Sequence, residues 1–137
     1  MNRKITEDEA FRAGTDLFNR GEYFAAHEIW EEIWLAAGGE TRRFLQGLIQ
    51  WALSLYHFQR GNLKGARKLF ESGDLLLKPF NPEFQGVSLS PLRNDMVICL
   101  QELFQCPVEL LAGFEDAEKN VRFEILPRER PVISIRF

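Results

Sequence analysis

Residues 18–31 read FNRGEYFAAHEIWE, and residues 58–71 read FQRGNLKGARKLFE. Aligned at a spacing of 40, the two stretches share Phe, Arg, Gly, Ala and Glu, and three further positions stay hydrophobic. Each stretch predicts a helical hairpin that turns at Arg-Gly and buries a small alanine where its second helix approaches the first. Tetratricopeptide hairpins look similar, but their period is shorter, and two copies are too few for a solenoid. We therefore predict an all-α fold, a compact bundle of about five helices built from two related hairpins, with a chance match as the alternative.

Start and stop signals place these helices along the chain. A capping box at Thr6-Glu7-Asp8-Glu9 begins the first helix, which is expected to end near Asn19. Single glycines and a glycine pair separate the second, third and fourth helices. Ser90-Pro91 supplies the N-cap and the first residue of a fifth helix, which is expected to end near Cys106-Pro107. The second to fourth helices are expected over about residues 22–37, 40–59 and 62–78, and residues 79–89 are expected to form a loop.

The end of the chain differs from the rest. Residues 1–107 are expected to form the helical bundle domain, and residues 108–137 a C-terminal extension packed on the bundle or trailing from it. The β-prone run at residues 132–137 follows two prolines and predicts an extended arm that lies on the body.

Composition limits the class of protein. The chain has 137 residues, 45% hydrophobic and 27% charged, which is the balance of one globular domain. Its net charge of -3 argues against nucleic acid as a partner, and no apolar stretch is long enough to span a membrane. Cys99 and Cys106 cannot form a disulfide framework or a four-thiolate zinc site, so we expect buried reduced thiols and a cytoplasmic location. A small ligand or a protein remains as partner.

The second helix carries two polar side chains on its predicted core side. On a helical wheel, His27 and Glu31 fall within an arc of aromatic and aliphatic residues that also holds Trp30, Trp34 and Leu35. A carboxylate in such surroundings must be paired, protonated or coordinating an ion. His and Glu at i and i+4 can reach one metal ion or exchange a proton.

The third helix is apolar around most of its circumference and has one narrow polar stripe, formed by Arg43, Gln46, Gln50, Ser54 and His57. Such a narrow stripe favours an internal cleft or a polar neighbour, and the face with His27 and Glu31 is the natural neighbour. A thin solvent-exposed edge is the alternative.

These residues have competing interpretations. His27 and Glu31 either contribute to a ligand site or form a hydrogen-bonded network that locks the bundle. Arg67 replaces the histidine in the second copy of the repeat and is a candidate counter-ion for Glu31 or Glu71.

The sequence does not show whether the protein is an enzyme. The run HEIWE lacks the second histidine of the zinc-peptidase motif, and no nucleophile elbow, phosphate-binding loop or dinucleotide fingerprint is present.

A longer pattern resembles a known family. A glycine and an aromatic residue precede His-Glu-x-x-Glu-x-x-Trp at residues 27–34, and Phe-Leu-Gln-Gly-Leu-Ile-Gln follows at residues 44–50, with a later His57. Over about residues 10–80 the chain resembles the proteins catalogued as domain of unknown function 309. The resemblance implies an all-α multihelical fold and no established activity. Its signature positions correspond to His27, Glu28, Glu31, Trp34, Gln46, Gln50 and His57.

The leading hypothesis is a polar pocket between the second and third helices that binds a small ligand or a divalent metal ion. Its ligand-binding candidates are His27, Glu31, Gln46, Gln50, Ser54, His57 and Arg67. The metal candidates among them are His27, Glu31 and His57, and Glu28 is the nearby base if a bound ion supports hydrolysis. The rival hypothesis is a non-enzymatic interaction module, in which the same polar residues stabilise the core and the outer surface or the arm binds another protein.

Overall fold

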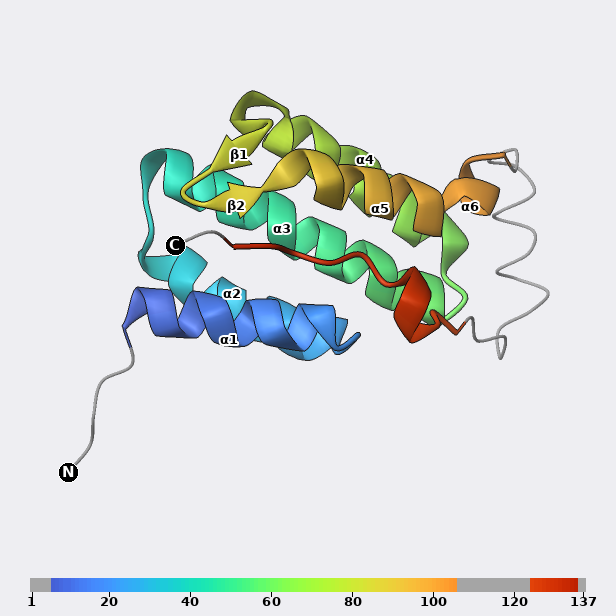
Figure 1. The fold of residues 1–137 in the computed structure, drawn as a ribbon, viewed down its shortest axis with the longest axis horizontal. Coiled ribbons are helices and arrows are strands. Elements are labelled where there is room, and N and C mark those ends of the chain that lie inside the picture. The colour runs from blue at the N-terminus through green and yellow to red at the C-terminus, as the bar shows by residue number, and fades with distance from the viewer. Residues whose placement is uncertain (1–5, 106–123, 136–137) are drawn as a thin grey trace.

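The computed structural model describes residues 6–105 and 124–135, and it is mostly helical (Figure 1). The order of elements is α1 (Glu7–Asn19), α2 (Tyr23–Ala36), α3 (Gly39–Gln59), α4 (Leu63–Leu77), η1 (Lys78–Phe80), β1 (Glu83–Phe84), β2 (Val87–Ser88), α5 (Leu89–Cys99), α6 (Gln101–Gln105) and η2 (Pro127–Glu129). Helices α1 and α2 pack as one pair and α3 and α4 as another, and α2 also packs on α3. The predicted bundle of two hairpins is therefore confirmed.

The two hairpins turn in the same way. At the end of α1, Gly21 has a φ of 86°, and at the end of α3, Gly61 has a φ of 80°. In each turn the glycine N–H donates to a carbonyl three residues back, and the next N–H donates to a carbonyl five residues back. This is the Schellman pattern, which needs a left-handed residue at the position of the glycine. The sequence repeat is thus a repeat of backbone geometry.

Each hairpin also holds a stacked Trp–Phe pair. Phe11 of α1 stacks on Trp30 of α2, with ring centroids 6.0 Å apart, and Trp51 of α3 stacks on Phe70 of α4 at 5.6 Å. The Trp30 indole donates to the Phe11 carbonyl at 3.3 Å, and the Trp51 indole donates to the Phe70 carbonyl at 3.0 Å. Positions 11 and 51, and positions 30 and 70, are equivalent in the repeat, so the tryptophan changes helix from one hairpin to the other.

A glycine accommodates each indole. Gly14 of α1 faces Trp30, where an added Cβ would overlap the ring, and Gly73 of α4 faces Trp51, where a Cβ would stand 2.5 Å from Cδ1. No side chain fits between helix and ring at either point, so the two helices of each hairpin approach closely.

The first four helices begin and end close to their predicted limits, whereas the region after α4 differs. At the start of α1, the Thr6 hydroxyl accepts a hydrogen bond from the Glu9 N–H at 3.1 Å, as the capping box predicts. Residues 83–88, expected to lie in a loop, form the β1–β2 hairpin, with Glu83 opposite Ser88. Its turn residues Gln85 and Gly86 both have positive φ, as a tight hairpin turn requires.

The prediction that Ser90 caps the fifth helix is wrong. Helix α5 begins at Leu89, and the N–H groups of Leu89 and Ser90 both donate to the carbonyl of Pro82. The hairpin loop therefore satisfies these amides and no side-chain cap is needed. The helix also breaks at Leu100, so that α5 and α6 replace one continuous element. The expected helix end at Cys106-Pro107 and the domain boundary after residue 107 lie outside the described residues.

The C-terminal arm crosses the bundle in extended form, as predicted, over the described residues 131–135. In Figure 1 it runs between α1 and α5. The Asn19 side chain accepts from the Ile133 N–H at 2.8 Å and donates to the Ile133 carbonyl at 3.0 Å. Ser88 N–H donates to the Ser134 carbonyl, and Ile135 forms an antiparallel bridge with Val87. Because Asn19 ends α1 and Val87 lies in β2, the arm connects the first hairpin to the region after the second.

We predict that Gly73→Ala destabilises the protein although alanine is the better helix former. The helix propensity gain is about 1 kcal/mol, but the new Cβ overlaps Trp51 and overpacks the core by about 1–3 kcal/mol. Chemical denaturation should show a lower free energy of unfolding. Gly38→Ser is the control, because a Cβ at that helix start meets no atom within 4 Å and serine is a good cap. A Gly73→Ala protein as stable as wild type would contradict this packing.

Candidate functional site

The predicted pair on α2 forms, but at the protein surface. His27 Nε2 lies 3.1 Å from Glu31 Oε2, while His27 Nδ1 lies 2.8 Å from the Phe24 carbonyl oxygen. The His27 side chain is 14% exposed and that of Glu31 is 51% exposed. The expectation that Glu31 lies in the core is therefore wrong, because half of its side chain is exposed to solvent.

The reason is the position of the neighbouring helices. Trp30 is fully buried at the centre of the α2 core face, whereas Phe24 is 44% and Leu35 is 66% exposed. A helical wheel gives the angle of each side chain, but it does not give the width of the arc that packing partners cover. On α2 that arc is narrower than the apolar pattern, so Glu31 lies at its edge. Glu28 is exposed.

The polar stripe of α3 faces outward between α2 and α4. Arg43 is exposed, while Gln46, Gln50 and His57 are partly buried. Ser54 is the exception, because it is buried toward α4 and donates to the Ala66 carbonyl at 2.6 Å. The stripe is narrow because helices pack on both flanks of α3, and most of it is partly or fully buried.

Two contacts set the register of α2 against α3. The rings of Phe24 and Tyr56 lie 5.0 Å apart, and the Arg42 guanidinium lies over the Trp34 ring at 4.0 Å. The helices are thus antiparallel, and interpolation along both axes gives Gln46 and Gln50 about the same height along the bundle as His27 and Glu31. We call this set of four residues the α2–α3 seam.

The remaining candidates lie elsewhere. His57 Nδ1 lies 3.2 Å from the Asn62 side-chain nitrogen at the start of α4. Within residues 6–105 and 124–135, no three His, Cys, Asp or Glu side chains form a group that could hold a metal ion. The structure therefore brings His27 and Glu31 together but does not add His57 to them.

Arg67 is paired within its own helix. Its Nε lies 3.1 Å from Glu71 Oε1, four residues later, so Arg67 is the counter-ion of Glu71 and the suggestion that it pairs with Glu31 is wrong. The Arg67–Glu71 pair occupies the positions of the His27–Glu31 pair in the repeat. A nitrogen-bearing side chain followed by Glu at i+4 is therefore common to both hairpins, and at this position the histidine occurs only in the first.

Among the residues that the structure describes, four buried side-chain atoms have no hydrogen-bond partner: Gln50 Oε1, Trp34 Nε1, Tyr23 Oη and Arg130 Nε. Two of them belong to the facing helices of the α2–α3 seam. Such atoms are rare in native proteins, and each calls for a ligand, a water molecule or a partner.

The other two atoms mark a region that the sequence did not indicate. Tyr23 begins α2, and burial raises the pKa of its hydroxyl, with smaller effects from Cys99 and Arg130. Cys99 ends α5 as a half-buried free thiol whose pKa burial raises to about 11, with a smaller contribution from Glu129. The expected reduced thiol is thus seen at Cys99, while Cys106 lies outside the described residues. No local pattern joins these residues, because they come from distant parts of the chain.

Comparison with known proteins finds a match within the two hairpins. Residues 11–69 match the family model described as domain of unknown function (DUF309). Over these residues the chain is similar to that family. The match extends from the first residue of the Phe11–Trp30 pair almost to the end of the repeat, and it includes the α2–α3 seam.

Two relatives are themselves uncharacterised. The chain is 30% identical over 88 residues to an uncharacterized protein of Aquifex aeolicus, a match covering 64% of this chain and 26% of that protein. It is 40% identical over 58 residues to the uncharacterized protein YpuF of Bacillus subtilis, covering 42% of this chain and 33% of YpuF. The chain therefore spans about a quarter to a third of the length of these relatives. Among the described helices, none is long and apolar enough to cross a membrane.

Proposed function

We propose that this helical bundle is a binding domain whose site is the α2–α3 seam, and that it takes a small polar ligand or a divalent metal ion. His27 and Glu31 contribute from α2, and Gln46 and Gln50 contribute from α3. A free thiol at Cys99 fits a reducing compartment such as the cytoplasm.

The observation that carries the proposal is the unpartnered Oε1 of Gln50. A buried acceptor without a donor lowers the stability of a free protein by about 1–3 kcal/mol. Trp34 Nε1, on the facing helix, is a buried donor without an acceptor. Both helices of the seam therefore carry a buried polar atom whose hydrogen bond is unmet.

The orientation of His27 supports an ion as part of the ligand. Its Nδ1 is occupied by the Phe24 carbonyl, and its Nε2 is directed at the Glu31 carboxylate. A metal-binding histidine is commonly held by a carbonyl at its second nitrogen in this way. Two protein groups would hold a divalent ion only together with water or with donor atoms of a small ligand.

A specific observation favours the rival function, a protein-interaction module. Phe24 and Leu35 expose large apolar side chains on α2 at the edge of the seam. In that case the His27–Glu31 pair would be a structural counterpart of Arg67–Glu71, and the partner protein would cover the exposed side chains.

We predict that Gln50→Leu stabilises the free protein, because it removes a buried unpartnered acceptor at similar side-chain volume. The expected gain in free energy of unfolding is about 1 kcal/mol. Ser54→Ala, on the same helix, is the matched control. Its hydroxyl makes a buried hydrogen bond, so its loss should lower the free energy of unfolding by about 1 kcal/mol. If Gln50→Leu destabilises the protein as Ser54→Ala does, Gln50 belongs to a structural network, and the protein-interaction module is the better explanation.

Calorimetric titration of untagged protein with ZnCl2 and MnCl2 tests the ion. We predict saturable binding of one of these ions that is lost in His27→Ala and in Glu31→Gln. Glu71→Gln is the control, since it breaks the equivalent i,i+4 pair of the second hairpin and should leave binding unchanged. Binding that persists in His27→Ala would place the ion elsewhere.

A further inference from the structure

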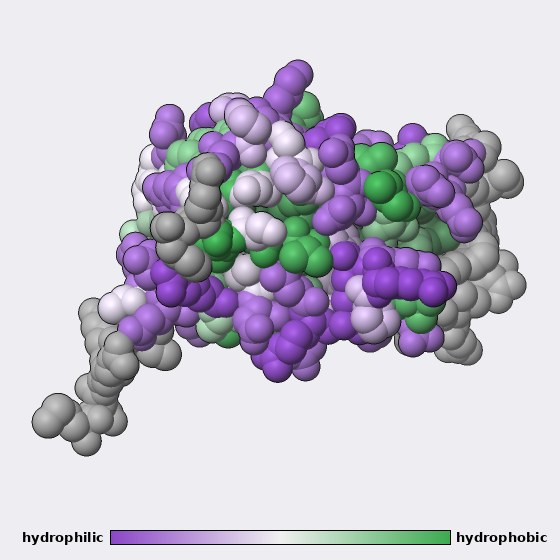
Figure 2. All heavy atoms as spheres, viewed as in Figure 1, coloured by the Kyte–Doolittle hydropathy of each residue, from purple (hydrophilic) through white to green (hydrophobic). Residues whose placement is uncertain are grey.

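A cavity of about 350 Å³ lies at the end of the bundle where α1 and α3 begin. Its described walls come from these two helix starts, from the last part of α2, from the β1–β2 hairpin and from the end of the arm. Figure 2 shows apolar surface beside the end of the arm and hydrophilic surface over the start of α1. The volume lies at the lower end of the range of small-molecule sites, so the cavity suits a small ligand.

The floor of this cavity is apolar. Six of the described lining residues have apolar side chains: Phe11, Ile33, Phe44, Leu45, Val87 and Ile135. Phe11 and Ile135 are only partly buried, so a ligand can reach them. The rings of Phe11 and Phe44 lie 6.4 Å apart and are tilted by 38° to each other. Because aromatic rings pack well against one another in tilted arrangements, this floor favours a ligand with an aromatic body.

The turn of the β1–β2 hairpin forms one polar edge of the cavity. Gln85 has a φ of 48°, and its exposed side chain donates to the Thr41 hydroxyl at 3.3 Å. Both residues line the cavity. Glycine, asparagine and aspartate are the usual residues at such a turn position, whereas the longer glutamine side chain reaches the start of α3. The Gln85 amide oxygen and the Thr41 hydroxyl therefore place hydrogen-bond acceptors at this edge.

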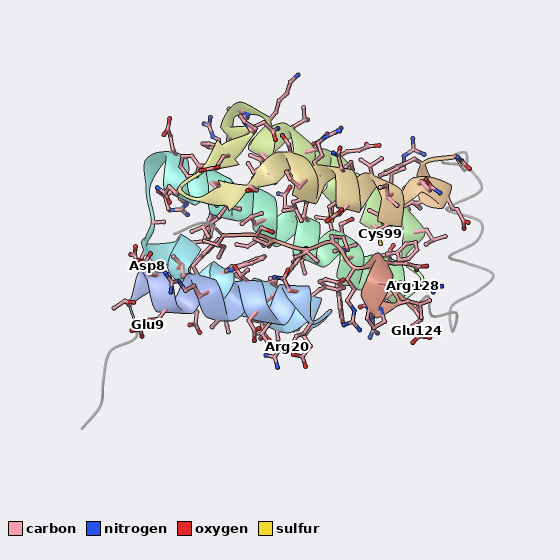
Figure 3. All side chains as sticks on the ribbon, in the orientation of Figure 1. Asp8, Glu9, Arg20, Cys99, Glu124 and Arg128 are labelled. Carbon is pink, nitrogen blue, oxygen red and sulfur yellow. The ribbon has the colours of Figure 1, made fainter. Side chains whose placement is uncertain are left out.

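Two carboxylates form the rest of the rim. Glu7 and Asp8 begin α1 with exposed side chains, and both line the cavity. In Figure 3, Asp8 lies on the side of α1 toward the arm, and Glu9 lies on the other side. Within the part of the chain that the structure describes, neither Glu7 nor Asp8 forms an ion pair, and Arg12 of the same lining has another interaction. A cationic group in the cavity is therefore attracted by the rim, and an anionic group is repelled.

We propose that this cavity binds a small primary amine with an aromatic body. The ring of the ligand lies on the apolar floor beside Phe11, and its ammonium group donates to the carboxylates of Glu7 and Asp8 at the rim. Neither an acid of the same size nor an amine without an apolar body matches both parts of the cavity. None of the described lining residues belongs to the α2–α3 seam, so this proposal does not rest on the function proposed there.

Titration of the full chain with phenethylamine, followed by nuclear magnetic resonance, tests the proposal. We expect saturable binding in the millimolar range or tighter and shifts in the methyl signals of Ile33, Val87 and Ile135, which line the cavity. Phenethyl alcohol, which lacks the charge, should bind about threefold more weakly, and hydrocinnamate, which carries a carboxylate, about tenfold more weakly. The absence of phenethylamine binding, equal binding of hydrocinnamate, or shifts confined to other methyl groups would each overturn the proposal.

Three variants locate the charged end of the ligand. Asp8→Asn and Glu7→Gln should each weaken phenethylamine binding about threefold and leave the binding of phenethyl alcohol unchanged. Glu9→Gln is the matched control, because it removes a charge from the same turn of α1 at a residue outside the cavity lining, and it should change affinity little. If Glu9→Gln weakens phenethylamine binding as much as Asp8→Asn does, the attraction is a general effect of the acidic helix start and the proposed site is wrong.

Discussion

The close packing of an indole on a glycine-bearing helix sets the geometry of both hairpins. In each, the tryptophan ring lies where no side chain would fit, against Gly14 or Gly73, and its N–H bonds to a carbonyl of the partner helix. A large flat ring gives much buried apolar area, and the hydrogen bond fixes its height along the helix. This contact sets the distance between the two helices of each hairpin, and that distance sets where α2 packs on α3.

That arrangement determines which polar groups reach the surface. Helix α2 covers one flank of α3 and α4 covers the other, so only a narrow polar edge of α3 is left between them. The edge carries Gln46 and Gln50 at about the same height along the bundle as His27 and Glu31, which gives the seam its combination of donors and acceptors.

Much of the bundle was predictable because its signals are local. Glycines at positions 21 and 61 and the Thr6 cap act within one helical turn, and the repeat at a spacing of 40 revealed the two hairpins. The burial of Glu31 was predicted wrongly, since helical periodicity gives the direction of a side chain but not what covers it. Ser90 as a cap failed for a related reason, because the Pro82 carbonyl replaced it. The approach of the Arg130 side chain to Gly21 joins distant parts of the chain, and no short-range pattern reports it.

The central claim is that Trp30 and Trp51 anchor the two hairpins by hydrogen-bonded indoles while the Trp34 indole has no such bond. Hydrogen exchange of the three indole N–H signals, followed by nuclear magnetic resonance in D2O, measures this directly. The account predicts slow exchange for Trp30 and Trp51, close to that of the most protected backbone amides, and much faster exchange for Trp34. Exchange of Trp30 or Trp51 as fast as that of Trp34 would contradict it.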